Sequence, residues 1–446
     1  MATTSTVTLD DVLAARKLLA DIVRHTPLAW SRPLSEQIGG EVWFKCENLQ
    51  RAGSFKIRGA YVRIHNLPPH ERARGVVAAS AGNHAQGVAL AATLHGIQST
   101  VFMPDGAPLP KIAATESYGA QVRFHGSTVD DALVAAKRFS QETGAALIHP
   151  FDHADIIAGQ GTVALEILDQ CPQVKTVLVA AGGGGLLAGI GTVMHALRPE
   201  VRVVGVQAAT AAAYPASLTA GTPTRIANMA TMADGIAVGC PGDVPFGIIR
   251  ELGTEILTVS EESISQASLL LLERNKLVVE PAGAVGVAAL LEAVSAGSGS
   301  VGAGPIKAGS AGAVLVDAGL SDAVLAHTAV SDAALPEFEP PIVAVLSGGN
   351  VDPLLLLRLI RHGLASAGRF LSLRLRLTDR PGALAQLLAA LAAVDANVVD
   401  VEHGRTSAGL GVGEVEVAVT LETRGADHAA AVLSRLTEAG YAPSVQ

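Results

Sequence analysis

The chain has 446 residues, of which 49% are hydrophobic, 3% aromatic and 16% charged, and its formal net charge is −9. This length predicts two or three domains, and the scarcity of aromatic side chains predicts cores built mainly from Ala, Val, Leu and Ile. The negative charge, together with the lack of a basic stripe, speaks against a nucleic-acid partner, because binding to phosphates requires clustered Lys and Arg.

The cysteines and the N-terminal segment indicate a cytoplasmic protein. Cys46, Cys171 and Cys240 are far apart and odd in number, so they form neither a disulfide framework nor a metal-ligand pattern. Segment 1–9 is polar and lacks the regions of a secretory signal. Segment 176–194 is uncharged and long enough to span a membrane, but four central glycines would interrupt a helix. We therefore expect a buried strand, a turn and a helix there, and no membrane partner.

From about residue 40 to 350, short β-branched runs alternate with Ala- and Leu-rich segments at helical spacing, such as 84–95 and 129–143. This alternation predicts a largely parallel sheet flanked by helices, with ligands bound where strands lead into helices. The expected strands are Glu41–Cys46, Gly75–Ala79, Ser99–Met103, Gln121–His125, Thr176–Ala181, Val201–Gln207, Glu255–Val259 and Pro341–Leu346.

Lys56 lies in the sequence GSFKIRGA (53–60), after a small-residue turn and an aromatic residue, at the start of an expected helix. A lysine that is desolvated or close to another cation becomes nucleophilic and can form a Schiff base with an aldehyde cofactor. An isolated lysine in this position would more often be a solvated helix residue.

Three loops follow expected strands and are suited to binding polar ligands. Segment 80–84 (SAGNH) opens a helix, so its backbone N–H groups could receive a carboxylate, and Asn83 is either an N-cap or a donor to a phenolate oxygen. Segment 182–185 consists of four glycines, which suit a phosphate group or a tight turn. Ser347, in SGGN (347–350), could contact a ring nitrogen or belong to an ordinary turn.

The last 150 residues change in composition twice. Segment 295–340 is a Gly- and Ser-rich insertion with little expected structure, although 313–316 could pair as a strand. From residue 369 a βαββα pattern follows, with a possible last strand at the C-terminus, which suits a separate α+β domain. We expect domains at 1–368 and 369–446. The elements of the second are strands 370–377, 397–403 and 414–421 and helices 383–394 and 426–439.

Taken together, the motifs GSFKIRGA, SAGNHAQG, GGGGLLAG, ADGIAV, EPAGAVG and SGGN, in this order, resemble the fold-type II pyridoxal-phosphate (PLP) enzymes, specifically the threonine ammonia-lyases. The resemblance implies an α/β fold of the tryptophan synthase β type with two parallel-sheet subdomains. It implies PLP as cofactor, and Lys56 as the catalytic Schiff-base lysine and the base for the Cα proton.

The resemblance also implies the residues that surround the cofactor and the substrate. Residues next to the cofactor ring would be Phe55, packed on its face, Asn83 on its hydroxyl and Ser347 on its nitrogen, with Gly235 and Glu280 nearby. The phosphate would be held by Gly182, Gly183, Gly184, Gly185 and Leu186. The amino-acid substrate would be bound by Ser80, Ala81, Gly82, Asn83 and His84.

The implied reaction is elimination from L-threonine to 2-oxobutanoate and ammonia, the entry to isoleucine, and from L-serine to pyruvate. Ala81 stands where racemising relatives carry a second serine, and Gln207, Ala211 and Ala213 stand where several relatives carry acidic metal ligands. We therefore expect elimination rather than racemisation, and no metal. Other functions remain open: a serine or hydroxyaspartate ammonia-lyase, a serine racemase, a β-replacement synthase, or a non-catalytic amino-acid sensor.

The C-terminal region resembles an ACT domain through its βαββα order and the sequence DRPGAL (379–384). The resemblance implies that Asp379 and Gly382 bind a free amino-acid effector where two such modules pair in a homodimer or homotetramer. The alternative is a dimerisation element without a ligand.

Overall fold

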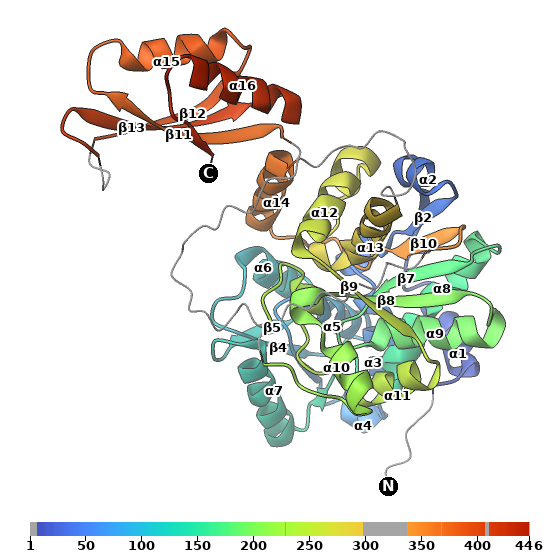
Figure 1. Cartoon of the computed structure of the whole chain (residues 1–446). Coiled ribbons are helices and arrows are strands. Elements are labelled where there is room, and N and C mark those ends of the chain that lie inside the picture. The colour runs from blue at the N-terminus through green and yellow to red at the C-terminus, as the bar shows by residue number, and fades with distance from the viewer. Residues whose placement is uncertain (1–6, 228, 298–336, 367, 406–409, 446) are drawn as a thin grey trace. The chain divides into compact units, whose positions relative to one another are not determined.

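The computed structural model describes residues 7–227, 229–297, 337–366, 368–405 and 410–445. The described residues up to 355 form one compact unit, and those from 356 onward form another (Figure 1). Of the expected insertion at 295–340, residues 295–297 end a helix, while the possible strand at 313–316 lies outside the described residues. The domain boundary at 368/369 stays a prediction.

The first unit contains two sheets and a series of helices. Its strands are β1 (Leu28–Trp30), β2 (Val42–Lys45), β3 (Val76–Ala79), β4 (Ser99–Met103), β5 (Gln121–Phe124), β6 (Ala146–Leu147), β7 (Thr176–Ala180), β8 (Arg202–Ala208), β9 (Glu255–Val259) and β10 (Ile342–Val345). Its α-helices are α1 (Leu9–Leu19), α2 (Arg32–Ile38), α3 (Lys56–His65), α4 (Pro69–Arg72), α5 (Asn83–Leu94), α6 (Leu109–Ser117), α7 (Val129–Thr143), α8 (Ala154–Gln170), α9 (Gly185–Leu197), α10 (Ala213–Ala220), α11 (Asp243–Glu251), α12 (Glu261–Asn275) and α13 (Pro281–Gly297). Short 3-10 helices are η1 (Glu47–Leu49), η2 (Arg51–Gly53), η3 (Ala209–Ala211) and η4 (Asp234–Ile236), and α14 (Pro353–Ser366) follows the last strand.

The larger lobe is built on a six-stranded sheet in the order β1-β2-β10-β7-β8-β9, in which only β1 is antiparallel to its neighbour. Alternate residues of β7 face two different apolar clusters: Val177 and Val179 pack with α1, α3, α8 and α9, and Leu178 and Ala180 pack with α12 and α13. Both faces of the sheet are therefore buried, which is why its strands read as continuous apolar runs in the sequence.

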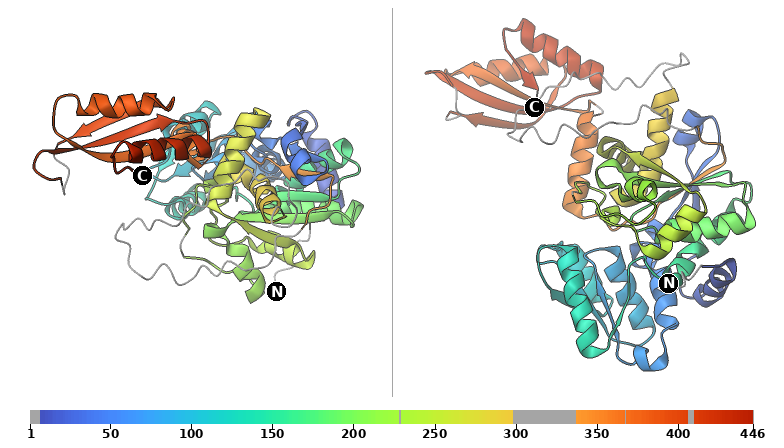
Figure 2. Two further views of the ribbon diagram at one scale, coloured as in Figure 1. Left: turned by 45° about the horizontal axis from the view of Figure 1, so that its top comes forward. Right: turned by 60° about the horizontal axis from the view of Figure 1, so that its bottom comes forward.

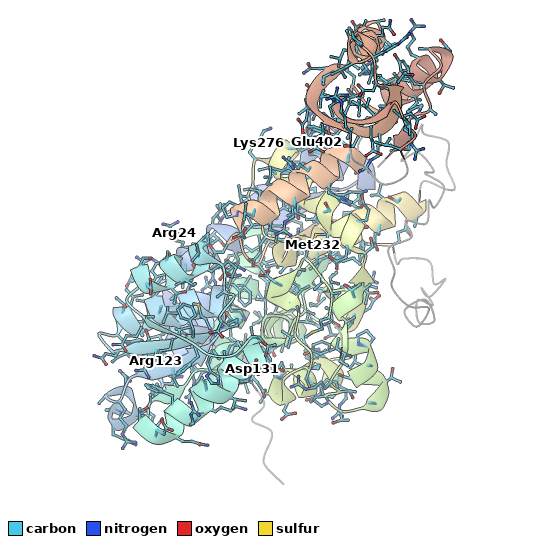
Figure 3. All side chains as sticks on the ribbon, turned by 90° about the vertical axis from the view of Figure 1, so that its left-hand side faces the viewer. Arg24, Arg123, Asp131, Met232, Lys276 and Glu402 are labelled. Atoms are coloured by element: carbon cyan, nitrogen blue, oxygen red, sulfur yellow. The ribbon has the colours of Figure 1, made fainter. Side chains whose placement is uncertain are left out.

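The smaller lobe is built on a parallel four-stranded sheet in the order β5-β4-β3-β6, and Figure 2 (right) shows it beside the larger lobe in blue to teal. Helix α7 begins with a capping box, in which Thr128 and Asp131 bond to each other's backbone N–H groups at 3.0 and 3.1 Å. Asp131 is labelled in Figure 3. All eight strands expected between residues 40 and 350 are confirmed. Strands β1 and β6 are not predicted from the sequence, because three and two residues are too few to show a period.

The second unit is an antiparallel sheet in the order β12-β13-β11-β14, with two helices. The strands are β11 (Phe370–Thr378), β12 (Asn397–Gly404), β13 (Glu414–Glu422) and β14 (Ser444–Val445), and the helices are α15 (Ala383–Ala392) and α16 (Ala426–Glu438). Leu373 and Leu375 pack with Leu387 of α15 and Leu436 of α16, while the intervening Arg374 and Arg376 are exposed. The expected βαββα order and the last strand are confirmed.

Segment 176–194 folds as strand β7, a glycine turn and most of helix α9, as expected. None of the helices within the described ranges is both long and apolar enough to cross a membrane.

Candidate active site

Lys56 is the first residue of α3. The turn before it is held by Ser347 and Gly348, which follow strand β10. Ala52 (φ 57°) and Gly53 (φ 69°) are both left-handed, and Ser54 forms an isolated bridge with Gly348. The Lys56 Nζ atom donates to the carbonyl oxygen of Pro150 at 3.0 Å and lies 5.1 Å from the centroid of the Phe55 ring. The lysine predicted at a helix start is therefore found there, with its amine directed back over Phe55.

The surroundings of Lys56 favour a neutral amine. Burial lowers the pKa of Lys56 to about 8, and the carboxyl group of Glu280 opposes this shift only in part. An amine with a pKa near 8 is substantially unprotonated in weakly alkaline solution, so it can act as a nucleophile and accept a proton.

The four glycines form the turn between β7 and α9. Of the backbone N–H groups from Gly182 to Leu186, none has an acceptor among the described residues. A Cβ on Gly183 would lie 2.3 Å from the ring of Phe151, and a Cβ on Gly184 (φ 100°) would lie 1.8 Å from Tyr214 Oη. The turn thus has no room for side chains on these glycines, and free N–H groups at the start of a 13-residue helix suit a phosphate.

A second set of free N–H groups lies in the turn between β3 and α5. Gly82 donates to Ser80 Oγ at 3.1 Å, whereas the N–H groups of Ala81, Asn83 and His84 have no acceptor among the described residues. Ser80 to Asn83 are all half-buried. The turn can therefore bind a carboxylate, as predicted for the substrate.

His84 lies beneath this turn and is buried. Its Nε2 atom donates to the carbonyl oxygen of Ile148 at 2.8 Å, and burial, followed by the charge of Lys56, lowers the pKa of His84 to about 3. The ring is therefore neutral at physiological pH. Its predicted role in lining the pocket stays a prediction, and the geometry suits a packed histidine.

Asn83 and Glu280 meet at the start of α5. Asn83 Nδ2 donates to Glu280 Oε1 at 2.5 Å, and a Cβ on Gly235 would lie 3.6 Å from the same oxygen. Burial, and then the charge of Asp234, raise the pKa of Glu280 to about 7. The structure thus brings together three residues predicted to lie near the cofactor ring.

Ser347 is buried beside Phe55, whose N–H donates to the Ser347 carbonyl oxygen at 3.2 Å. Its hydroxyl makes no hydrogen bond within the part of the chain that the structure describes. A hydroxyl without a partner among the described residues fits the predicted contact with a ring nitrogen.

Several residues that shape the site are not predicted from the sequence. Pro150 accepts from Lys56, Phe151 and Tyr214 limit the glycine turn, and Asn350 bonds to Asn83 Oδ1 at 2.8 Å. Asn350 stands in the SGGN motif and could have been singled out there. The other three carry no signal, because their neighbours in space are far away in the sequence.

A buried network of charges lies behind α3. Arg58, two residues after Lys56 in α3, donates to Glu47 Oε1 at 2.8 Å and to Glu166 Oε1 at 2.7 Å. Lys45 donates to Glu166 Oε2 at 2.6 Å. Two cations and two carboxylates balance one another, and all four side chains are buried. The network joins the start of α3 to α8, β2 and η1.

Gln207 stands where several relatives carry a metal ligand and where we expect no metal. Both ends of its side-chain amide form hydrogen bonds within the chain. The amide nitrogen donates to the Ala181 carbonyl oxygen at 2.8 Å, and the oxygen accepts from the Tyr214 N–H at 3.0 Å. Ala211 and Ala213 offer no ligand atoms. Over the described ranges, no three His, Cys, Asp or Glu side chains are arranged to hold a metal ion.

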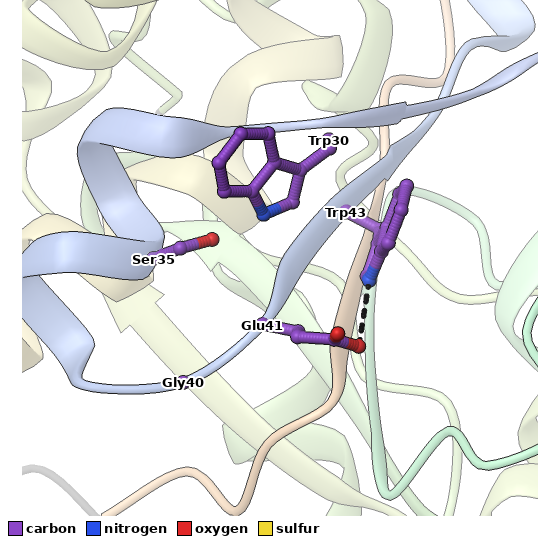
Figure 4. A pocket seen from close by; sticks show the side chains of 5 residues that line it. All are labelled: Trp30, Ser35, Gly40, Glu41 and Trp43. Carbon is purple, nitrogen blue, oxygen red and sulfur yellow. Dashed lines mark hydrogen bonds between the residues drawn. The ribbon is translucent and has the colours of Figure 1, made fainter.

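A separate surface hollow of about 470 Å³ lies at the edge of the six-stranded sheet (Figure 4). Its lining includes Trp30, Glu41 and Trp43, and the indole of Trp43 donates to Glu41 Oε2 at 3.3 Å. It shares no residue with the site around Lys56.

In the second unit, the two predicted effector residues differ in their freedom to bind. Asp379 forms a two-point ion pair with Arg405, at 3.1 and 3.2 Å. Gly382 caps α15 with φ 88°, and a Cβ there would meet no atom within 4 Å. Open space therefore lies next to Gly382, whereas the carboxylate of Asp379 already has a partner.

Comparison with known proteins agrees with this geometry. Residues 19–303 match the family model of the pyridoxal-phosphate dependent enzymes, and residues 371–439 match that of the ACT domain. The L-threonine ammonia-lyase of Thermotoga maritima is 41% identical over 98% of this chain and 98% of its own length. Threonine deaminase isoform 2 from Solanum lycopersicum, in its processed form, has a TM-score of 0.67 and 32% identity, covering 79% of this chain and 86% of that one. Maize serine racemase has the same TM-score and identity, covering 81% and 98%.

Proposed function

The chain belongs to the pyridoxal-phosphate-dependent enzymes and carries an ACT domain, and from this premise we propose that it is an L-threonine ammonia-lyase. It would convert L-threonine to 2-oxobutanoate and ammonia, and L-serine to pyruvate and ammonia. The observation that carries the proposal is the similarity to a named L-threonine ammonia-lyase over 98% of both chains.

The residues around Lys56 fit the cofactor. Bound PLP would supply an electron sink for breaking bonds at Cα and Cβ of an amino acid. The N–H groups from Gly182 to Leu186 would hold its phosphate, the free hydroxyl of Ser347 its ring nitrogen, and Asn83 its ring hydroxyl. Phe55 would pack on the ring, with Gly235 and Glu280 next to it.

Two parts of the site would act on the substrate. The turn from Ser80 to Asn83 would bind the substrate carboxylate through its free N–H groups. The Lys56 amine, whose pKa is lowered to about 8 by burial, would take the Cα proton on one face when it is unprotonated. The water lost in the elimination returns when the released enamine is hydrolysed, so that threonine yields only 2-oxobutanoate and ammonia.

Ala81 supports elimination over racemisation. Racemisation needs a second group that donates a proton on the opposite face of Cα, within hydrogen-bonding reach. A methyl group at position 81 has no proton to give.

The ACT domain supports regulation by an amino acid. We propose a free amino acid, such as isoleucine, as effector, bound beside Gly382 where two modules pair in a homo-oligomer. The open space next to Gly382 supports this placement.

A substrate panel tests the proposed function. Purified enzyme with PLP is given L-threonine, L-serine and hydroxyaspartate, and 2-oxo acid and ammonia are measured together with D-serine. L-Threonine should give the highest kcat/KM, with equal amounts of 2-oxobutanoate and ammonia. Borohydride reduction and peptide mapping should place the pyridoxyl group on Lys56. A label on Lys45 or Lys111, or D-serine formed as fast as pyruvate, would contradict the proposal.

A further inference from the structure

Asn350 contacts both parts of the chain that would act on the cofactor ring. Its Nδ2 atom donates to the carbonyl oxygen of Ala52 at 2.7 Å, in the turn before Lys56. The same Nδ2 atom lies 2.8 Å from Asn83 Oδ1 and 3.3 Å from Gln86 Oε1, on helix α5. Among the described residues, no other side chain is hydrogen-bonded both to the turn before Lys56 and to Asn83.

The chemistry of the acceptors fixes the direction of both amide groups. The Ala52 carbonyl oxygen can only accept, so the Asn350 atom that faces it is the NH2 group. This NH2 group also faces Asn83, so the Asn83 atom on that side must be the oxygen. Asn83 must then turn its own NH2 group the other way, where Glu280 Oε1 accepts it at 2.5 Å.

The glycines around Asn350 make room for this arrangement. A Cβ on Gly53 would lie 2.2 Å from Asn350 Oδ1, and a Cβ on Gly348 would lie 2.2 Å from Glu280 Oε1 and 2.9 Å from Asn83 Nδ2. Both glycines are therefore required by the amide chain as well as by the turns in which they stand.

We propose that Asn350 is a positioning residue: it holds Asn83 with its NH2 group toward the ring hydroxyl and fixes the left-handed turn that delivers Lys56. This inference rests on the proposed function in one respect, namely the place of Asn83 at the cofactor ring. Without Asn350, the Asn83 amide could rotate by half a turn and present its oxygen to another oxygen, which repels it.

The strain in the turn before Lys56 supports the second half of this role. Ala52 is a non-glycine residue at φ 57°, a conformation that is strained for a residue with a Cβ and persists only when neighbouring groups hold it. The hydrogen bond from Asn350 to the Ala52 carbonyl oxygen is such a restraint.

The test compares four variants of the full-length enzyme loaded with PLP. Asn350→Ala removes the donor, and Asn350→Asp places an acceptor against three acceptors at nearly the same volume. Asn83→Ala is the benchmark. Asn48→Asp is the matched control, because Asn48 is buried nearby and donates to the Val278 carbonyl oxygen at 3.1 Å without contacting Asn83. The readouts are the pH dependence of the cofactor's absorbance bands, which report the proton on the ring oxygen, thermal unfolding, and kcat with KM.

Both Asn350 variants should shift the absorbance bands in the direction of Asn83→Ala, and by at least half as much. They should lower kcat by about 10–100-fold, the range seen when a residue that orients a ligand-binding group is lost. Asn48→Asp should lower the unfolding temperature without shifting the bands.

The proposal is overturned if Asn83→Ala shifts the bands while the Asn350 variants behave like Asn48→Asp. It is also overturned if Asn83→Ala leaves the bands unchanged. The spectrum requires only bound PLP. If the variants show these shifts while the wild-type enzyme fails to deaminate L-threonine, the proposed reaction is contradicted and the role of Asn350 remains supported.

Discussion

The Lys56 side chain owes its reactivity to burial more than to neighbouring charges. A lysine in water is almost entirely protonated at neutral pH, and an ammonium group neither attacks an aldehyde nor accepts a proton. Transfer into the site disfavours the charged form, and Glu280 restores only part of that cost. The amine is thus prepared before any ligand binds.

This leads to a prediction for cofactor association. Because the pKa of Lys56 is about 8, the neutral fraction of the amine grows as the pH rises through 8 and then saturates. The rate of PLP attachment to cofactor-free enzyme should therefore rise about tenfold between pH 7 and 9 and then level off. Stopped-flow absorbance measures it. An amine with an ordinary pKa would instead give a rise of about 100-fold over the same range, with no plateau.

The glycine turn gives a second prediction at this scale. Gly184→Ala combines a left-handed φ with a collision at Tyr214 Oη, so it should displace the turn and raise the Kd for PLP at least about tenfold. Absorbance titration of the cofactor measures it. Gly221→Ala is the control, since Gly221 has φ 73° but open space around its Cβ. It should cost stability without changing the Kd. Equal Kd values for the two variants would rule out the cradle.

Among the elements, α3 and α8 are joined by two kinds of ion pair. Arg58 reaches Glu166 in the buried network, whereas Arg63 reaches Asp155 at 3.3 Å, with both side chains about one-fifth exposed. Removing one member of a buried network leaves an uncompensated charge away from water, which is costly. The Arg63–Asp155 pair is partly exposed, so its members are solvated when it is broken and little stability is lost.

Urea unfolding should separate these two pairs. Arg58→Met should lower the free energy of unfolding by about 3–5 kcal/mol, because Glu47 and Glu166 lose their shared partner. Arg63→Met, on the same two helices, should cost about 1 kcal/mol or less. If the two variants lose similar stability, the buried network does not hold α3 in place.

At the scale of the whole molecule, the chain combines a catalytic unit with a module of a different fold and a core of its own. An effector bound to that module can change activity only if it binds two states of the enzyme with different affinities. The free energies involved in such coupling are usually about 1–3 kcal/mol, which corresponds to about 5–150-fold in affinity.

Threonine saturation curves with and without isoleucine should show this coupling in the full chain and lose it in a chain that ends at Ala367. The truncated enzyme should keep its cofactor absorbance and basal turnover. Valine serves as a second ligand of similar shape. If the full chain responds to none of the proteinogenic amino acids while truncation alters its oligomeric state, the module serves dimerisation instead.

The sequence by itself determined the elements and the chemistry of the loops. Buried parallel strands such as β7 must be apolar on both faces, so they appear as short apolar runs between helical periods. The glycine turn and the segment around Lys56 are each one contiguous stretch of the chain. The sequence alone therefore identifies both motifs and the order in which they occur. The two-layer ACT module was likewise visible, because each Leu of β11 alternates with a polar residue.

Only the tertiary structure decided which distant residues meet. Glu280 lies 197 positions and Asn350 lies 267 positions after Asn83. The amide and carboxyl groups of these three residues nevertheless form one hydrogen-bonded chain. Arg58 and Glu166 are separated by 108 positions. Local propensity and periodicity carry no information about such pairs, because their proximity depends on how lobes and helices pack. The same packing partly buries Lys56 and lowers its pKa, which the residue type alone leaves near that of any exposed lysine.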